Sequence, residues 1–163
     1  YFKKNGKITN YKFDNKIINS ISKNLYLIPT GISRKVETVL TKQKNNIHKN
    51  IHQLNQISKI TDLAFKIIKN KKFDQVGYLL NEYWSIKKTL SDNVSNKKID
   101  DLFDECIYSG AIGGKICGAG NGGFLLLYVP KKNQKKFENE NIKKNYIKIR
   151  PDEFGSRIVL NNK

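Results

Sequence analysis

The chain has 163 residues, of which 38% are hydrophobic and 10% aromatic, so it is long and apolar enough for one folded domain and too apolar for disorder. Its formal net charge of +17 comes from 28 lysines against only 3 arginines, spread along the chain beside 20 Asn and 21 Ile, the residue types that A/T-rich codons enrich together. Because phosphate and base contacts favour the planar fork of Arg, the composition argues for a solvated basic surface and against a specific nucleic-acid partner.

The secondary structure is predicted from the spacing of apolar residues. Alternating residues indicate strands, whereas apolar residues at steps of three and four indicate helices. In chain order the expected elements are strands at 8–13 and 25–28, a helix entered at Ser33, helices at about 45–70, 73–90 and 99–107, a strand at 124–129, a helix at 131–138, and strands at 146–149 and 156–160. This order predicts an α+β fold with helices packed on one face of a mainly antiparallel sheet.

Cys106 and Cys117 lie among apolar residues, and two cysteines make no disulfide framework in a chain of this length. We expect both thiols to be reduced and buried. No secretory signal is visible, and no apolar stretch is long enough for a transmembrane helix, so we expect a cytoplasmic protein without a membrane partner. The sequence begins at Tyr1 and contains no Met, which indicates a processed chain or a piece of a longer one.

Two clusters of side chains could bind a metal ion. His48 and His52 are four residues apart, but Lys49 stands where a zinc protease helix has Glu, and the sequence offers no obvious third ligand. Four carboxylates at 100–105 share one helix face without the pattern of a calcium loop. We interpret the histidines as surface residues and the carboxylates as a solvated face paired with lysines, and we predict no metal site.

The segment GGKICGAGNGGFLLLYVP (113–130) holds six of the eleven glycines in the chain. Glycine is kept where φ must be positive or where another group approaches the backbone closely. The apolar run at 124–129, closed by Pro130, predicts a strand buried on both faces. The glycines before it therefore indicate either a cramped turn or a cradle for a small charged group.

The stretch GAIGGKICGAGNGGFLLLYVP (110–130) resembles the third conserved motif of the GHMP kinases, and most closely the branch that contains D-glycero-D-manno-heptose 7-phosphate kinase. Asn121 departs from the glycine run of that branch, but Asn tolerates positive φ, so the shape of the loop can survive. Three further stretches resemble segments of the branch in the same order: IPTGISRKVETVL (28–40), LLNEYWSIKKTLSDNVSNKKIDDLF (79–103) and FGSRIV (154–159).

The resemblance implies the C-terminal half of a sugar kinase. Neither the family's phosphate-cradling Gly-Leu-Gly-Ser-Ser loop nor the segment with its catalytic Asp occurs in the sequence, so we assign no catalytic residue to this chain and expect it to be inactive alone. Residues 1–24 would end the preceding domain, and residues 25–163 would form the C-terminal domain, whose partner is the N-terminal half of the same kinase. The implied cofactors are ATP and Mg²⁺, held mainly by that N-terminal half.

The glycine motif is the cofactor-binding candidate that the resemblance implies. Its bare backbone N–H groups could donate to the anionic oxygens of ATP, although a tight turn without a ligand is the alternative. The residues assigned to this role are Gly118, Ala119, Gly120, Asn121 and Gly122. We expect Gly120→Val to reduce turnover far more than stability, because a β-branched side chain forbids positive φ and fills the space for phosphate.

Substrate contacts are expected at five further positions. Thr30, Gly31 and Arg34 follow a strand and open a helix, which makes an anion site there, with a helix cap and a surface ion pair as the alternative. Trp84, the only tryptophan, could stack on a sugar face or pack in the core. Lys115 flanks the glycine loop, with or without a contact to phosphate.

The acceptor that the resemblance implies is heptose 7-phosphate, phosphorylated at its anomeric hydroxyl. A dianionic acceptor needs cationic donors outside the nucleotide site, so Arg34→Ala should raise KM for the sugar phosphate and leave KM for ATP nearly unchanged. A kinase of a neutral sugar such as fucose and a non-catalytic scaffold derived from a kinase are the alternatives, followed by a basic nucleic-acid-binding module.

Overall fold

The computed structural model describes residues 11, 13–33 and 36–152, except for the side chains of residues 36–39. The helices are α1 (Asn15–Ser22), α2 (Val36–Asn45), α3 (Ile51–Lys69), α4 (Asp74–Lys88), α5 (Lys97–Tyr108) and α6 (Gln134–Glu140), with short 3₁₀ helices at His48–Asn50, Lys131–Asn133 and Ile142–Lys144. The strands are β1 (Leu25–Pro29), β2 (Gly113–Ile116), β3 (Phe124–Tyr128) and β4 (Ile147–Lys148).

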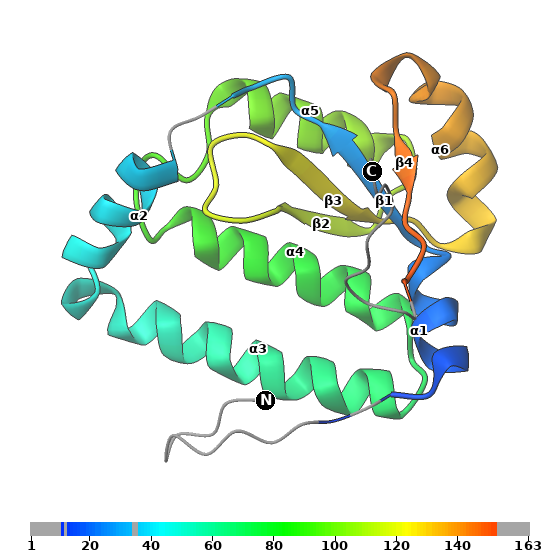
Figure 1. Ribbon diagram of the computed structural model, residues 1–163, viewed down its shortest axis with the longest axis horizontal. Helices are drawn as coiled ribbons and strands as arrows, with labels where there is room; N and C mark the ends of the chain where they lie inside the picture. The colour runs from blue at the N-terminus through cyan, green and yellow to red at the C-terminus, as the bar shows by residue number, and fades with distance from the viewer. Residues whose placement is uncertain (1–10, 12, 34–35, 153–163) are drawn as a thin grey trace, which may run out of the picture.

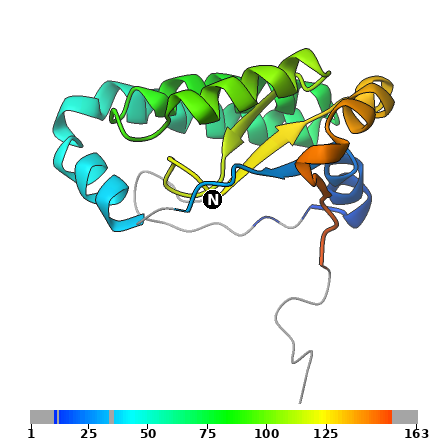
Figure 2. The same cartoon turned by 90° about the horizontal axis from the view of Figure 1, so that it is seen from above.

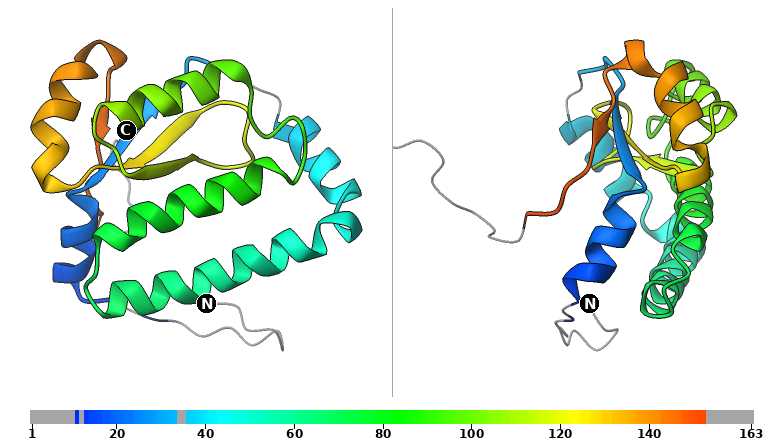
Figure 3. Two further views of the ribbon diagram at one scale, coloured as in Figure 1. Left: turned by 180° about the vertical axis from the view of Figure 1, so that it is seen from behind. Right: turned by 90° about the vertical axis from the view of Figure 1, so that its right-hand side faces the viewer.

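The four strands form one antiparallel sheet in the order β2-β3-β1-β4. The central pair sets the register, with Ile28 of β1 opposite Leu125 of β3 and Leu27 opposite Leu126. Helices α3, α4 and α5 lie in one layer and the sheet lies against that layer, as Figure 2 and the right panel of Figure 3 show. The predicted α+β fold, with helices on one face of an antiparallel sheet, is therefore confirmed.

The core lies between the sheet and these helices. Side chains at alternate strand positions are fully buried, among them Tyr26 and Ile28 of β1 and Leu125 and Leu127 of β3, because period-two side chains share one face of a strand. They pack with a stripe of α5 residues at helical spacing, namely Ile99, Phe103 and Cys106. A smaller cluster of Ile60, Ile67 and Leu79 joins α3 to α4, which lie side by side in Figure 1.

The helix α5 begins at Lys97, two residues before the expected range of 99–107. Asn96 is the N-cap, and its side-chain oxygen accepts a hydrogen bond of 3.1 Å from the backbone N–H of Ile99. The acidic face of α5 is paired with lysines, as predicted: Lys88 lies 3.2 Å from Asp100, and Lys97 lies 2.9 Å from Asp101. Such exposed ion pairs contribute little to the stability of the fold.

Three expectations about the elements are wrong. Gly113 and Gly114, assigned to the glycine loop, belong to strand β2. Tyr11 and Phe13, assigned to a strand, lie in no strand, and their rings pack on Phe65 of α3 at centroid distances of 4.6 and 5.6 Å. The helix α1 that follows was missed, although Asp14 caps it by accepting from the N–H of Lys16 at 2.8 Å.

Two further expectations have a mixed or open outcome. β3 is largely buried, as predicted, but its first residue, Phe124, is 42% exposed, so the strand is not covered on both faces at that end. The closing strand expected at 156–160 lies outside the described residues, as do residues 8–10 and 12 of the first expected strand. Among the described residues, no helix combines the length and apolar character needed to cross a membrane.

Candidate functional site

The glycine loop is the turn that joins β2 to β3. Where the strands β2 and β3 enter this turn, the N–H of Cys117 donates to the carbonyl of Phe124 at 2.8 Å. Most of the loop residues have a left-handed backbone, with φ of +73° at Gly118, +119° at Gly120, 58° at Asn121, +145° at Gly122 and +84° at Gly123. This backbone explains why the sequence gathers glycines here, since side-chain-bearing residues rarely adopt such angles.

The loop is held tightly against two neighbouring segments. A Cβ atom added to Gly120 would lie 2.6 Å from the carbonyl oxygen of Val94, and one added to Gly122 would lie 2.6 Å from that of Ile32. Backbone hydrogen bonds join the same segments, from Asn121 to Val94 at 2.6 Å and from Gly123 to Ile32 at 3.1 Å. Gly120→Val must therefore lower stability as well as turnover, which changes the expectation drawn from the sequence.

Asn121 fits the position where the resembling branch has glycine. Its left-handed backbone is one that Asn tolerates, as the sequence indicated. Its side-chain oxygen also accepts a hydrogen bond of 2.7 Å from the side-chain nitrogen of Asn96, the residue that caps α5. Asn121 thus ties the glycine loop to the start of α5, a contact that glycine could not make.

The carbonyl groups and the N–H groups of the loop differ in their hydrogen-bond partners. The carbonyl of Gly118 accepts a hydrogen bond from the Lys87 ammonium, and the carbonyl of Ala119 accepts one of 3.1 Å from the side chain of Gln43. In contrast, four N–H groups of the loop have no acceptor among the described residues: those of Gly118, Ala119, Gly120 and Gly122. Such N–H groups can bind an anion, because each unmade hydrogen bond favours an acceptor from outside.

Thr30 and Gly31 lie beside the other end of the loop. The backbone N–H and the hydroxyl of Thr30 both donate to the carbonyl of Gly123 at 2.9 Å, and Thr30 is 4% exposed. Thr30 therefore anchors the loop to the end of β1. Gly31 has a φ of +66° and lies next to Lys98, whose ammonium would be 3.8 Å from a Cβ at position 31.

A groove of about 720 Å³ opens beside these residues, between the end of β1, α5 and the segment before β4. Four lysines line it, together with two carboxylates that neutralise part of their charge: Lys97, Lys98, Lys143, Lys144, Asp101 and Glu105. Lys97 pairs with Asp101, and Lys144 lies 3.2 Å from Glu105. Lys98 and Lys143 make no ion pair with a described residue, so the groove carries a net positive charge that suits an anion.

The remaining predicted substrate residues do not share one place. Trp84 is 1% exposed and packs in the core, so a sugar ring cannot stack on it, and the core alternative holds. Lys115 lies on β2, and its ammonium is 4.8 Å from the centre of the Tyr83 ring of α4. The ammonium of Lys87 lies near the same ring. Arg34 lies outside the described residues.

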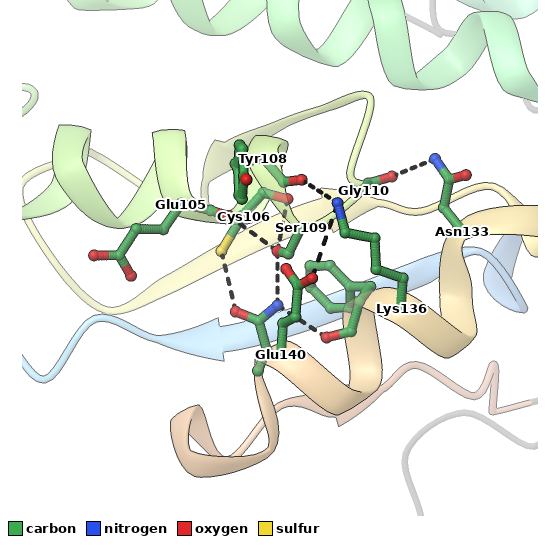
Figure 4. A network of polar contacts seen from close by, with 10 residues as sticks. Glu105, Cys106, Tyr108, Ser109, Gly110, Asn133, Lys136 and Glu140 are labelled. Atoms are coloured by element: carbon green, nitrogen blue, oxygen red, sulfur yellow. Dashed lines mark hydrogen bonds and ion pairs between the residues drawn. The ribbon is translucent and has the colours of Figure 1, made fainter.

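A polar network at the far end of α5 is structural and not catalytic (Figure 4). The side chain of Asn141 donates to the hydroxyl of Ser109 at 2.8 Å, and that hydroxyl donates in turn to the carbonyls of Glu105 and Cys106. Cys106 is fully buried here, and burial raises the pKa of its thiol to about 12. A neutral buried thiol is a poor nucleophile. The network therefore fastens α6 to the end of α5.

The two thiols should differ in their reaction with iodoacetamide at pH 8. Cys117 is half-buried, whereas Cys106 is fully buried with a raised pKa, so its thiolate is scarce at this pH. We expect Cys117 to be alkylated in the native protein and Cys106 to react only after unfolding. Peptide mass spectrometry before and after denaturation measures this, and equal labelling of the native thiols would contradict the structural role of Cys106.

Neither metal candidate from the sequence gains a ligand set. Among the described residues, no group of three or more His, Cys, Asp or Glu side chains converges in a way that could hold a metal ion. His48 and His52 lie on the outside of the molecule, at the start of α3.

Comparison with known proteins gives one matching family model, described as GHMP kinases C terminal, over residues 64–148. The D-glycero-alpha-D-manno-heptose 7-phosphate kinase of Campylobacter jejuni is 25% identical over 120 residues, which cover 72% of this chain and 35% of that protein. The bifunctional fucokinase/GDP-fucose pyrophosphorylase of Arabidopsis thaliana is 30% identical over 121 residues, covering 69% of this chain and 11% of that protein.

Among solved structures, the mevalonate kinase of Methanococcus jannaschii superposes with a TM-score of 0.65 and 25% identity, covering 84% of this chain and 42% of that one. The L. major mevalonate kinase in complex with R-mevalonate has a TM-score of 0.63 and 18% identity, covering 74% of this chain and 38% of that one, which shows a shared fold. The chain spans 35% or less of the length of the two curated relatives above.

Proposed function

Because the chain belongs to the GHMP kinases, whose C-terminal domain it matches over more than half its length, we propose that it forms the C-terminal part of an ATP-dependent kinase of a sugar phosphate. The acceptor is heptose 7-phosphate, and the group phosphorylated is its anomeric hydroxyl. Residues 25–163 form the C-terminal domain, and residues 1–24 end the domain before it. The catalytic base and the main phosphate loop lie in the rest of the kinase, so this chain alone is inactive.

One observation carries the proposal: the glycine loop offers four backbone N–H groups without a partner among the described residues. Catalysis of phosphoryl transfer depends mainly on positioning and on stabilising negative charge. Fixed N–H donors at the phosphates do both, and they need no side chain for it. The N–H groups of Gly118, Ala119, Gly120 and Gly122 would hold phosphate oxygens of ATP, and Mg²⁺, held by the rest of the kinase, would supply positive charge to the same phosphates.

The groove beside Gly31 supports an acceptor that is itself an anion. It begins at residues that touch the glycine loop, because Thr30 donates to Gly123 and Asn96, next to Lys97, donates to Asn121. Lys98 is the exposed cation nearest that end and has no ion pair with a described residue. We assign the sugar-bound phosphate to the groove near Lys98, with Arg34 as the further cation that the sequence indicated.

A neutral-sugar kinase is the second candidate function, favoured by the similarity to the plant fucokinase. The two candidates differ in their need for a cation at the acceptor site. The full-length protein should be assayed with ATP and Mg²⁺ on heptose 7-phosphate, free heptose, fucose and free hexoses. We expect turnover on heptose 7-phosphate at a kcat/KM at least about 100-fold above that on the free sugars, since charge-assisted contacts to phosphate are lost with the latter.

Lys98→Met should raise KM for heptose 7-phosphate about tenfold and leave KM for ATP unchanged, the pattern of a lost ground-state contact. Lys23→Met, at an exposed lysine away from the groove, is the matched control. Preference for fucose would replace the heptose-phosphate assignment with the second candidate. If the protein turns over none of these sugars, whether or not it binds ATP, the remaining interpretation is a non-catalytic scaffold derived from a kinase.

A further inference from the structure

Lys87, on the helix α4, is a buried cation at the edge of the glycine loop. It is 6% exposed, and among the lysines whose side chains the structure describes it alone is buried. Burying an ammonium group costs free energy unless hydrogen bonds replace its water. Most of the lysines whose side chains the structure describes are exposed, so a buried one indicates a specific task. Its neighbour Lys88 is exposed and pairs with Asp100.

The task follows from where Lys87 donates. Its ammonium hydrogen-bonds to the carbonyl of Gly118, the first loop residue with a left-handed backbone. From the helix α2, the side chain of Gln43 donates to the next carbonyl, that of Ala119, at 3.1 Å. Figure 1 shows α2 and the C-terminal end of α4 both reaching the turn between β2 and β3. Two side chains from different helices therefore hold two successive peptide units of the loop.

Holding a carbonyl also aims an N–H group. Each peptide unit is planar and trans, so its C=O and N–H point in opposite directions. The carbonyl of Gly118 shares its peptide unit with the N–H of Ala119, and the carbonyl of Ala119 shares its unit with the N–H of Gly120. Lys87 thus turns the Ala119 N–H away from α4, and Gln43 turns the Gly120 N–H away from α2. Both N–H groups lack a partner among the described residues.

We propose that Lys87, assisted by Gln43, is a positioning residue of the phosphate site: it fixes the Gly118–Ala119 peptide so that the loop N–H groups face the phosphates before ATP binds. The positive charge of the Lys87 ammonium, which is hydrogen-bonded to the carbonyl oxygen, also polarises the peptide unit and makes its N–H a stronger donor. In this proposal Lys87 acts on the phosphate site through the loop backbone and not by touching phosphate. This inference rests on the proposed function, in which the loop binds phosphate.

The test compares Lys87→Met with Lys88→Met in the full-length protein labelled with ¹⁵N-Ala and ¹⁵N-Gly. We expect the order parameters of the Ala119 and Gly120 amides to fall from about 0.85 to below about 0.6 in Lys87→Met. Lys88→Met should keep the wild-type values, because the contacts of Lys88 among the described residues are with Asp100 and the Trp84 ring and not with the loop. With kinase activity per folded molecule as the second readout, kcat should fall about 100-fold in Lys87→Met and stay within about twofold in Lys88→Met.

The two readouts separate failure of this inference from failure of the proposed function. An inactive wild-type protein would reject the function, while the order parameters would still test Lys87. Wild-type order at Ala119 and Gly120 in Lys87→Met would overturn the inference, because a merely structural lysine changes the folded fraction and not the loop of the folded molecules. Should Lys87→Met not fold, Gln43→Met replaces a half-buried side chain and must loosen the Gly120 amide in the same way.

Discussion

Gly113→Ala should lower the free energy of unfolding by about 3 kcal/mol, at the upper end of overpacking effects. A Cβ atom at Gly113 would lie 1.9 Å from the carbonyl oxygen of Gly77 and 3.0 Å from Cβ of Asn81, both on α4. The obstructing atom is backbone, so no side-chain rotation relieves the clash, and α4 must move away from β2. That movement opens the contact between the helix layer and the edge of the sheet.

Gly31→Ala is the matched control, since it adds the same methyl group at a place with room. The nearest atom is the Lys98 ammonium at 3.8 Å, an ordinary contact, and the remaining cost is the left-handed backbone at φ +66°. That cost is about 1 kcal/mol. Urea unfolding of the 163-residue chain, followed by fluorescence of Trp84, the only tryptophan, measures both variants. Equal losses at the two sites would contradict close packing of α4 on β2.

The same contact explains why strand β2 could not be predicted from the sequence. Gly113 and Gly114 lack the β-branched and aromatic side chains that indicate a strand, and glycine is unfavourable in one. They lie in β2 because α4 and the neighbouring strand come too close for any side chain, which is a tertiary cause. A local pattern cannot report such an approach. The close pairing of Gly77 with Gly113, 36 positions apart in the chain, becomes visible only in the folded molecule.

Elements with a strong local signal were predicted well. The apolar run LYLI predicted β1, and apolar residues at steps of three and four predicted α3, α4 and α5. The helix α1 had a usable signal too, because Asp14 caps it and Ile17, Ile18 and Ile21 follow at helical spacing. The alternation of apolar residues at 8–13 indicated a strand that would end directly before this cap. Tyr11 and Phe13 are apolar because they pack on α3, which alternation cannot distinguish from a strand.

The candidate site could be predicted in part. The glycine cluster identified the loop, and the tolerance of Asn for positive φ identified Asn121 as compatible with it. The residues that hold the loop could not be found, because Lys87 and Gln43 come from helices remote in sequence and one lysine among 28 carries no local mark. For Trp84 the sequence left a sugar platform and the core as alternatives, and the large apolar surface of its ring lies in the core.

Gly120→Ala should reduce kinase turnover per folded molecule about 100-fold, the loss expected when reacting groups are misplaced by about 1 Å. The added Cβ would lie 2.6 Å from the carbonyl oxygen of Val94 at a backbone φ of +119°, so the loop must leave its place against Val94. In the proposed function, the loop N–H groups that lack a partner among the described residues would then no longer point at the phosphates. Because the fold is also strained, thermal unfolding must be measured together with kcat.

The control for this prediction is Asn121→Gly, one residue further along the same loop. Glycine accepts the left-handed backbone at φ 58°, and the change removes only the 2.7 Å hydrogen bond from Asn96. We expect a loss of about 1 kcal/mol in stability and nearly wild-type kcat, since the peptide units of Gly118, Ala119, Gly120 and Gly122 keep their orientation. A Gly120→Ala protein that is as active per folded molecule as Asn121→Gly would show that the loop is a turn without a role at the phosphates.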